Sequence, residues 1–388
     1  MFKCSVVGAC AVATTCWVLA ACGSSSRAPD PIAGVVHQYA VDLDANYKDS
    51  ITQAMALQKA VNAFVQSPSA AGLAACQAAW LDAHQRYGQS EYSRFYGGPI
   101  DQVQGGVNEW PIDESFIDYT VQTPDGGIVN DPPAYPQITQ QVLATADEKG
   151  SLENLSTGFH AIEFLLWGER PNPSGGPGTR PYTDYVDGGT AANQDRRRTY
   201  LQVATALLVA DLLGLEAEWH LSDSASYASK LLAGPSHDAL ADALRGLSQM
   251  AISEILYERL DDPFVAKDEK DEESCFSETT IDDLVSNALG IEDAYLGHYT
   301  TLSGTVLSGP SISDLVKAKN PALDTQLRQA MAAARAAIGA IPPPFDQACL
   351  APASSPANMA VAAAVAAFQP MQGLFDQVGK ALGIDLNL

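Results

Sequence analysis

The chain has 388 residues, and its 22 Lys and Arg against 46 Asp and Glu give a formal net charge of -24 at pH 7. This charge repels phosphate backbones and anionic lipid surfaces, so nucleic acid is excluded as an expected partner. Hydrophobic residues make up 46% of the chain, which is enough for a globular protein, and the length favours two domains.

The first 22 residues are predicted to be a targeting segment. Lys3 precedes an apolar, uncharged run over 6–21, which is too short for a stable membrane span and typical of a secretion signal. The run ends in Leu19-Ala20-Ala21-Cys22, which resembles the lipobox of bacterial lipoproteins. We therefore expect a lipid anchor at Cys22 as the only membrane attachment, a tether over 23–30, and a place in the bacterial envelope, in the periplasm or at the outer membrane. An ordinary signal peptide is the alternative.

From Pro31 onward, apolar residues recur with the spacing of a helix, as at Val35, Tyr39 and Leu43, whereas strand patterns are scarce. The sequence therefore predicts an all-α protein. The expected helices lie at about 31–66, 70–96, 135–148, 152–167, 193–220, 236–260, 279–299, 311–340 and 356–381.

Three long loops separate these helices. Gly97–Tyr135 is rich in aromatic and apolar residues, so we expect it to be ordered. Gly168–Gly189 contains four prolines, is expected to hold no helix, and marks the junction between a domain over 31–190 and a second over 191–388. The third loop, Asp261–Glu278, carries an acidic run over 268–273 that is interpreted as a solvated loop.

The mature chain keeps three cysteines besides Cys22, namely Cys76, Cys275 and Cys349. No C-x-x-C spacing occurs, which excludes a zinc ribbon and a dithiol redox motif. One internal disulfide at most is possible in an oxidising compartment, and the sequence does not choose the pair.

One short segment combines chemistry with burial. Between Gly158 and Gly168 only His160 and Glu163 are polar, so this helix is expected to be buried on every side. Positions three apart on a helix are neighbours, and the imidazole and the carboxylate should point into the same enclosed space. Unpartnered burial of a charged carboxylate costs several kcal/mol, so the pair must be satisfied either by a hydrogen bond within the core or by a metal ion.

Further candidate metal ligands lie upstream. Trp80, His84, Tyr87 and Glu91 fall on one helical stripe that mixes aromatic bodies with polar ends, as the wall of a pocket does. The loop that follows adds the carboxylates of Asp101, Asp113 and Glu114. We take Glu91, Asp101 and Asp113, with His160 and Glu163, as the candidate metal ligands, although a helix cap or a surface acid is the simpler interpretation of each loop residue.

Together these segments resemble the imelysin family, whose marker G-x-H-x-x-E is present here as Gly158, His160 and Glu163. The resemblance extends over most of the mature chain, through 80–91, 95–101, 110–119, 274–277 and 290–297. It departs at 277–280, where this chain reads Ser-Glu-Thr-Thr and relatives usually read Asp-Asn-Thr-His.

The resemblance implies two helical-bundle domains packed side by side, with the motif near their interface, and a role in iron acquisition. We expect an envelope lipoprotein that binds a metal ion, iron rather than zinc, or an iron-bearing ligand. The resemblance also implies a metallopeptidase, which is the alternative, although the chain has no H-E-x-x-H and His160 and Glu163 supply only two groups. A scaffold in which the pair is a core hydrogen bond is the third hypothesis.

Overall fold

The computed structural model describes residues 30–170, 176–267 and 271–386, together with Met1. Cys22 and nearly all of the tether lie outside the described residues, so the lipid anchor stays a prediction. The described residues are predominantly helical, which confirms the predicted all-α class. Their one sheet is an antiparallel hairpin of β1 (His298–Thr300) and β2 (Val306–Ser308).

The described helices comprise α-helices, three short 3₁₀ turns labelled η1 to η3, and the π-helical segment η4. Their bounds, in chain order, are α1 (Pro31–Gln66), α2 (Ala70–Gly88), η1 (Glu91–Ser93), η2 (Ile100–Gln102), α3 (Gln104–Asn108), α4 (Glu114–Ile117), α5 (Gly127–Asn130), α6 (Gln140–Ala146), α7 (Gly158–Trp167), η3 (Tyr182–Tyr185), α8 (Gln194–Trp219), α9 (Tyr227–Ala233), α10 (Ser236–Gln249), η4 (Met250–Asp261), α11 (Asp262–Ala266), α12 (Thr280–Leu296), α13 (Ile312–Lys319), α14 (Pro321–Ile338), α15 (Phe345–Leu350) and α16 (Pro356–Leu382).

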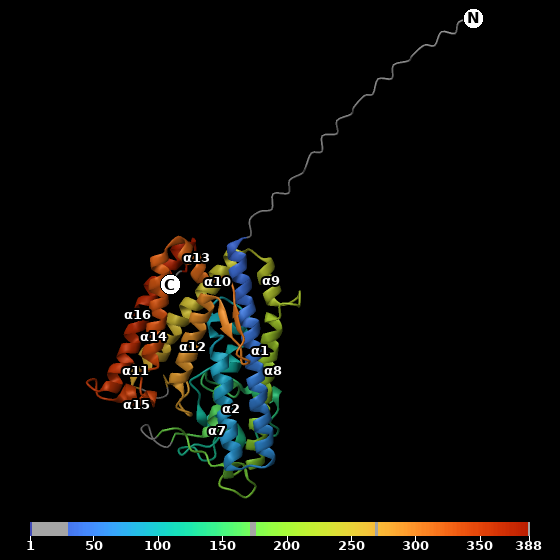
Figure 1. Ribbon diagram of the computed structural model, residues 1–388. Coiled ribbons are helices and arrows are strands. Elements are labelled where there is room, and N and C mark those ends of the chain that lie inside the picture. The colour runs from blue at the N-terminus through green and yellow to red at the C-terminus, as the bar shows by residue number, and fades with distance from the viewer. Residues whose placement is uncertain (2–29, 171–175, 268–270, 387–388) are drawn as a thin grey trace.

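The helices pack side by side, with α10 and α12 between the two flanks of the molecule. Figure 1 shows α1, α2 and α8 at one flank of the molecule and α14 and α16 at the other. Between them, α12 contacts α2 on one side and α14 and η4 on the other, while α10 packs on both α1 and α16. The short α7, which carries the G-x-H-x-x-E segment, packs against α2 and α8.

The buried apolar residues of both halves belong to one continuous cluster. The helix α8, which begins the predicted second domain, packs closely on α1 and α7 of the predicted first domain. The division at 190/191 therefore stays a prediction. By length and composition α8 could also cross a membrane, but it packs along those helices and buries the charged Arg197.

Several helices end earlier than the bounds predicted from their apolar pattern. The helix predicted over 70–96 stops at Gly88, because the hydroxyls of Ser90 and Ser93 donate to backbone carbonyls three residues back and compete with the helix. The helix predicted over 311–340 is two helices, because Pro321 cannot continue a helix and Asn320 caps the next one.

Other differences have similar local causes. The helices predicted over 135–148 and 152–167 shrink to α6 and α7, which start after the N-cap residues Thr139 and Thr157. The loop 168–189, expected to hold no helix, contains the 3₁₀ turn η3 directly after Pro181. The short helices α9 and α15 were not predicted, because neither has a long apolar repeat.

Candidate functional site

The helix α7 is held against the loop around α3 by its first residue. Gly158 has φ +81°, a conformation that favours glycine, and a Cβ there would lie 2.7 Å from the carbonyl oxygen of Val107. This close approach explains the glycine of the motif. It brings His160 and Glu163 beside α3, where both are buried, as the apolar sequence around them predicted.

His160 and Glu163 bond to each other, and Ser277 bonds to the carboxylate. His160 Nδ1 lies 3.0 Å from Glu163 Oε2, while Glu163 Oε1 accepts from both the backbone N–H (2.8 Å) and the hydroxyl (2.7 Å) of Ser277. Burial lowers the pKa of His160 well below its usual value and raises the pKa of Glu163 to about 8, although the Ser277 donors oppose the second shift. Both groups are therefore mainly neutral at pH 7.

His84 on α2 is the second imidazole of the site. Its ring stacks on Trp80 and lies 5.3 Å from the His160 ring, centroid to centroid. Burial opposes a charge on His84, but Asp283 Oδ1, 3.0 Å from its Nδ1, helps to raise its pKa to about 9. The charged ring donates its Nε2–H to Asn108 Oδ1 at 2.8 Å, so His84 becomes a ligand only after it loses a proton and its bond to Asn108.

These rings converge with Glu273 on one small space. One ring nitrogen of His84, one of His160 and one carboxylate oxygen of Glu273 lie within 4.8 Å of one another, close to the ~4 Å limit for donors that bind one ion at ~2.1 Å. The Nε2 of His160 is buried without a hydrogen-bond partner. His160 and Glu273 both line a cavity of about 20 Å³, which is large enough for one water or ion.

The residues present fit a metal ion of the iron group. Two imidazoles and one carboxylate are a donor set used for ferrous iron, and zinc accepts the same atoms. Each imidazole is also oriented at Nδ1 by a buried carboxylate, Glu163 for His160 and Asp283 for His84. Metal-binding histidines are commonly held in this way, so Glu163 is placed to orient His160 rather than to bind the ion directly.

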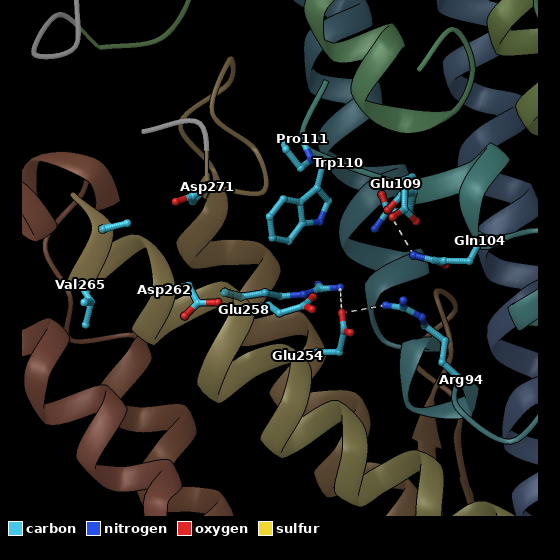
Figure 2. A pocket seen from close by; sticks show the side chains of 13 residues that line it. Arg94, Gln104, Glu109, Trp110, Pro111, Glu254, Glu258, Asp262, Val265 and Asp271 are labelled. Atoms are coloured by element: carbon cyan, nitrogen blue, oxygen red, sulfur yellow. Dashed lines mark hydrogen bonds and ion pairs between the residues drawn. The ribbon is translucent and has the colours of Figure 1, made fainter. Parts of the chain in front are cut away.

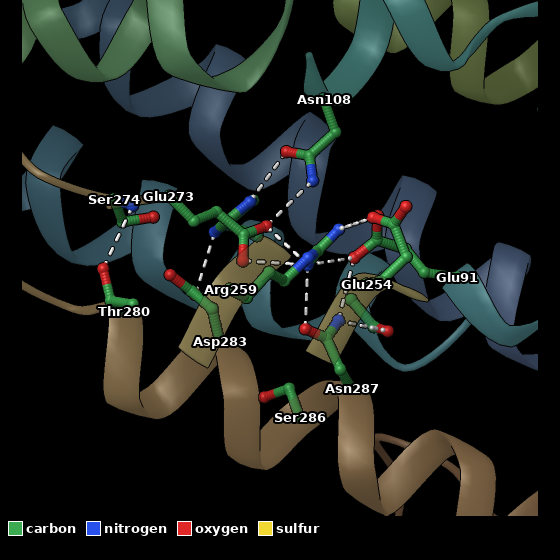
Figure 3. A network of polar contacts seen from close by, with 12 residues as sticks. Glu91, Asn108, Glu254, Arg259, Glu273, Ser274, Thr280, Asp283, Ser286 and Asn287 are labelled. Carbon is green, nitrogen blue, oxygen red and sulfur yellow. Dashed lines mark hydrogen bonds and ion pairs between the residues drawn. The ribbon is translucent and has the colours of Figure 1, made fainter. Parts of the chain in front are cut away.

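Arg259 lies among the carboxylates of Glu91, Glu254 and Glu273 (Figure 3). Its guanidinium donates to Glu273 at 2.8 Å, to Asn287 at 2.9 Å and to Glu91 at 3.2 Å. Burial alone would raise the pKa of Glu91, but Arg259 and Arg94 outweigh it and lower the pKa to about 2. Glu91 points inward, as the stripe on α2 indicated, yet the structure places it in an ion-pair network and away from the group of His84, His160 and Glu273.

Asp101 and Asp113 do not join the site. The carboxylate of Asp101 is exposed and accepts four backbone N–H groups of the turn over 95–98. Asp113 is the N-cap of α4 and accepts from the backbone and hydroxyl of Ser115. The simpler interpretation of both residues, a local cap, is the one that the structure supports.

The acidic run 268–273 was interpreted as a solvated loop, and for its last two residues this is wrong. Glu272 and Glu273 are each only 2% exposed, because Arg259 and Arg170 lie opposite them, while 268–270 lie outside the described residues. Glu273 was not predicted as a site residue, because a run of acidic residues does not indicate which distant side chains will pair with it. The signal available was its position two residues before the apolar Cys275-Phe276. The thiols of Cys76, Cys275 and Cys349 are all free.

Two larger pockets share lining residues with the cavity of about 20 Å³. The first, about 500 Å³, shares Trp110 and Pro111 with the cavity, and Figure 2 shows these two side chains opposite the acidic residues of η4 and α11. The second, about 340 Å³, shares Glu114, Cys275 and Phe276 with it. These shared side chains border the cavity and the two pockets alike.

Comparison with known proteins identifies relatives over most of the chain. A sequence profile described as Imelysin, classed by its name among peptidases, matches residues 43–371. Iron-regulated protein A of Synechococcus elongatus is 27% identical over 374 residues, which cover 93% of this chain and 89% of that protein.

Solved structures share the fold. An iron-regulated protein A precursor of Parabacteroides distasonis has a TM-score of 0.71 at 20% identity, covering 92% of this chain and 97% of its own. An imelysin-like protein of Psychrobacter arcticum has a TM-score of 0.65 at 16% identity, covering 91% and 96%.

Proposed function

Because the chain belongs to the imelysin family, we propose that it is an envelope lipoprotein that binds a divalent cation, iron in the first place, during iron uptake. His84, His160 and Glu273 would hold the ion, with Glu163 and Asp283 orienting the two rings. A bound ion would supply a positive charge to this buried group of carboxylates and, with an open coordination position, could hold an iron-bearing ligand.

One observation carries this proposal. The Nε2 atom of His160 is buried, has no hydrogen-bond partner and lines a cavity that it shares with Glu273. Buried polar atoms are almost always paired, and an orphan atom costs about 1–3 kcal/mol. A ligand that fills the cavity removes this cost, whereas a purely structural His160–Glu163 hydrogen bond leaves it in place.

The choice of iron rests on two supports. The donor set of two imidazoles and one carboxylate suits ferrous iron, and the relative from Synechococcus elongatus is named an iron-regulated protein. The name of that relative suggests, for this chain, a place in iron metabolism. Zinc is the competing ion that the experiment must include.

The envelope location is supported by sequence alone. The lipobox-like end at Cys22 and the short polar stretch before Pro31 would attach the folded body, which begins with α1, to a membrane surface. Substituting Cys22→Ala should release the protein from the membrane fraction, and mass spectrometry of the mature N-terminus should show the lipid on the unsubstituted protein. Retention of Cys22→Ala in the membrane would contradict the anchor.

The peptidase suggested by the family's name has less support in the geometry. Of the candidate bases, Glu91 is held as an anion by two arginines and has a pKa of about 2, which makes it a weak proton acceptor, and Asp113 caps α4. Glu163 is bonded at both oxygens. Cleavage of an unfolded protein that is stopped by a chelator and lost in Glu163→Gln would establish the peptidase instead.

The direct experiment measures metal in the protein. Mature protein is purified without chelating resin, its iron and zinc are quantified, and Fe²⁺ binding is measured anaerobically by calorimetry. His160→Ala should abolish the high-affinity site, whereas the matched control His237→Ala, which changes an exposed histidine, should bind as the unsubstituted protein does. Equal binding by the two variants would reject the proposal.

A further inference from the structure

Glu272 is the most weakly compensated carboxylate near the site. Its side chain is 1% exposed, and neither of its oxygens makes a hydrogen bond of normal geometry, although the Thr280 hydroxyl lies close enough to lower its pKa. Its nearest cation is Arg170, whose Nη1 lies 3.6 Å from Glu272 Oε2. The same guanidinium also pairs with Glu278 and, at 2.8 Å, with Asp346. These three carboxylates therefore share one guanidinium, and of the three Glu272 lies farthest from it.

This arrangement is costly as it stands. Burial raises the pKa of Glu272 well above its usual range, and the neighbouring Glu278 raises it further. An unbonded buried carboxylate costs several kcal/mol when ionised, and it is retained only where something offsets that cost. Lys267, which lines a small cavity on the far side of Glu272, already donates its ammonium group to the Cys349 carbonyl.

On its other side Glu272 faces the candidate metal centre. It lines the same cavity of about 20 Å³ as Glu273 and as His160, whose Nε2 is buried without a partner, while His84 does not line this cavity. Glu278 and Asp346, the other two acids around Arg170, do not line this cavity. Glu272 alone among the three therefore borders both the guanidinium and the cavity.

We propose that Glu272 is an additional carboxylate ligand of this cavity, held beside Arg170 until a cation arrives and then turned to it. The inference rests on the proposed cation binding and adds the residue that sets its selectivity. With Glu272 the donor set gains a second carboxylate. Added oxygen ligands benefit Mn²⁺ and Fe²⁺, which take up to six ligands, more than Zn²⁺, which commonly binds four, so Glu272 would narrow the advantage that Zn²⁺ has at such sites. Arg170 remains paired with Glu278 and Asp346 when Glu272 leaves it.

The chain offers a matched pair of variants for the test. Glu272→Gln and Glu278→Gln each remove one carboxylate from Arg170 and keep the side-chain shape, but only the first removes a group that lines the cavity. Binding of Mn²⁺ and Zn²⁺ is measured by calorimetry, with the free Mn²⁺ signal in electron paramagnetic resonance as a second readout. The melting temperature of the metal-free protein shows whether each variant is folded.

For Glu272→Gln we expect Mn²⁺ affinity to fall by about tenfold or more and Zn²⁺ affinity by about threefold or less, with an unchanged or higher melting temperature. Glu278→Gln should keep both affinities within about threefold. Equal losses in the two variants would show a general charge effect and overturn the inference. Wild-type affinity in Glu272→Gln, with binding abolished in His160→Ala, would also overturn it while leaving the proposed function intact. An unsubstituted protein that binds neither ion would reject both.

Discussion

Binding of a divalent cation at this site should be tightly linked to pH, because protons occupy the positions that the cation needs. His84, with a pKa of about 9, must lose one proton to become a ligand. The neutral pair of His160 and Glu163 must lose a second proton. His160 can bind the ion through Nε2 only when its ring hydrogen is on Nδ1, and that N–H donates to Glu163 only when Glu163, with a pKa of about 8, is ionised. Both groups bind protons more weakly when the metal is present, so affinity rises with pH and is lost as pH falls.

The size of the effect follows from these two values. Between pH 6 and pH 8 the deprotonated fraction of a group with pKa 9 grows about 90-fold, and the ionised fraction of a group with pKa 8 about 50-fold. Together they predict that Mn²⁺ affinity rises by at least about 10³ over this range. Calorimetry at pH 7 in two buffers of different ionisation enthalpy should count two or more protons released per ion, because Glu273, with a pKa of about 7, and Glu272, whose pKa is raised by burial, must also ionise to bind the ion. An affinity change below tenfold, or a proton count near zero, would refute the assigned protonation states.

Three further substitutions test the supports of the site. Arg259→Ala should lower the free energy of unfolding by about 3–5 kcal/mol in denaturant titrations, because Glu91 and Glu273 are left buried and unpaired; a loss below 1 kcal/mol would contradict this. Gly158→Ala should cost about 1–3 kcal/mol by the same measurement, because of its φ of +81° and the Val107 carbonyl, and an unaffected variant would show that the backbone yields freely. Ser277→Ala removes a donor that lowers the pKa of Glu163, so the pH midpoint of Mn²⁺ binding should move upward, and a downward move would be the wrong sign.

The fold was predictable to the extent that helices carry long apolar repeats. The bounds predicted for the first helix, 31–66, agree with α1 because Asp30 caps it, Pro31 starts it and its apolar face is continuous. The break at Asn320–Pro321 was also readable in the sequence, but the Ala-rich composition around it favoured one helix. Helices that follow no repeat, such as α15, depend on tertiary contacts that composition does not reveal.

The candidate site was predictable in part. His160 and Glu163 were identified because they are the polar residues of an otherwise apolar helix, and such a local pattern is enough to predict that a helix is buried. The partners of these residues come from loops and helices more than 100 residues away, as Ser277 does, and no spacing rule connects them. Glu91 was recognised as inward-facing, but its partner Arg259 lies 168 positions later, so its role as one half of an ion pair could not be read from the sequence.

The charges around the cavity explain why protons and a cation can exchange there. In the metal-free protein three cations, Arg94, Arg259 and His84, face three carboxylates, those of Glu91, Glu254 and Asp283. Burial raises the pKa of Glu273 to about 7 and that of Glu163 to about 8, and it also raises the pKa of Glu272, so these carboxyls hold several protons at pH 7 and the group is close to neutral. A divalent ion balances the charge left by two of the protons that it displaces, whereas a monovalent ion balances only one. The enclosure that makes an empty site costly thus also selects the charge of the ion that can fill it.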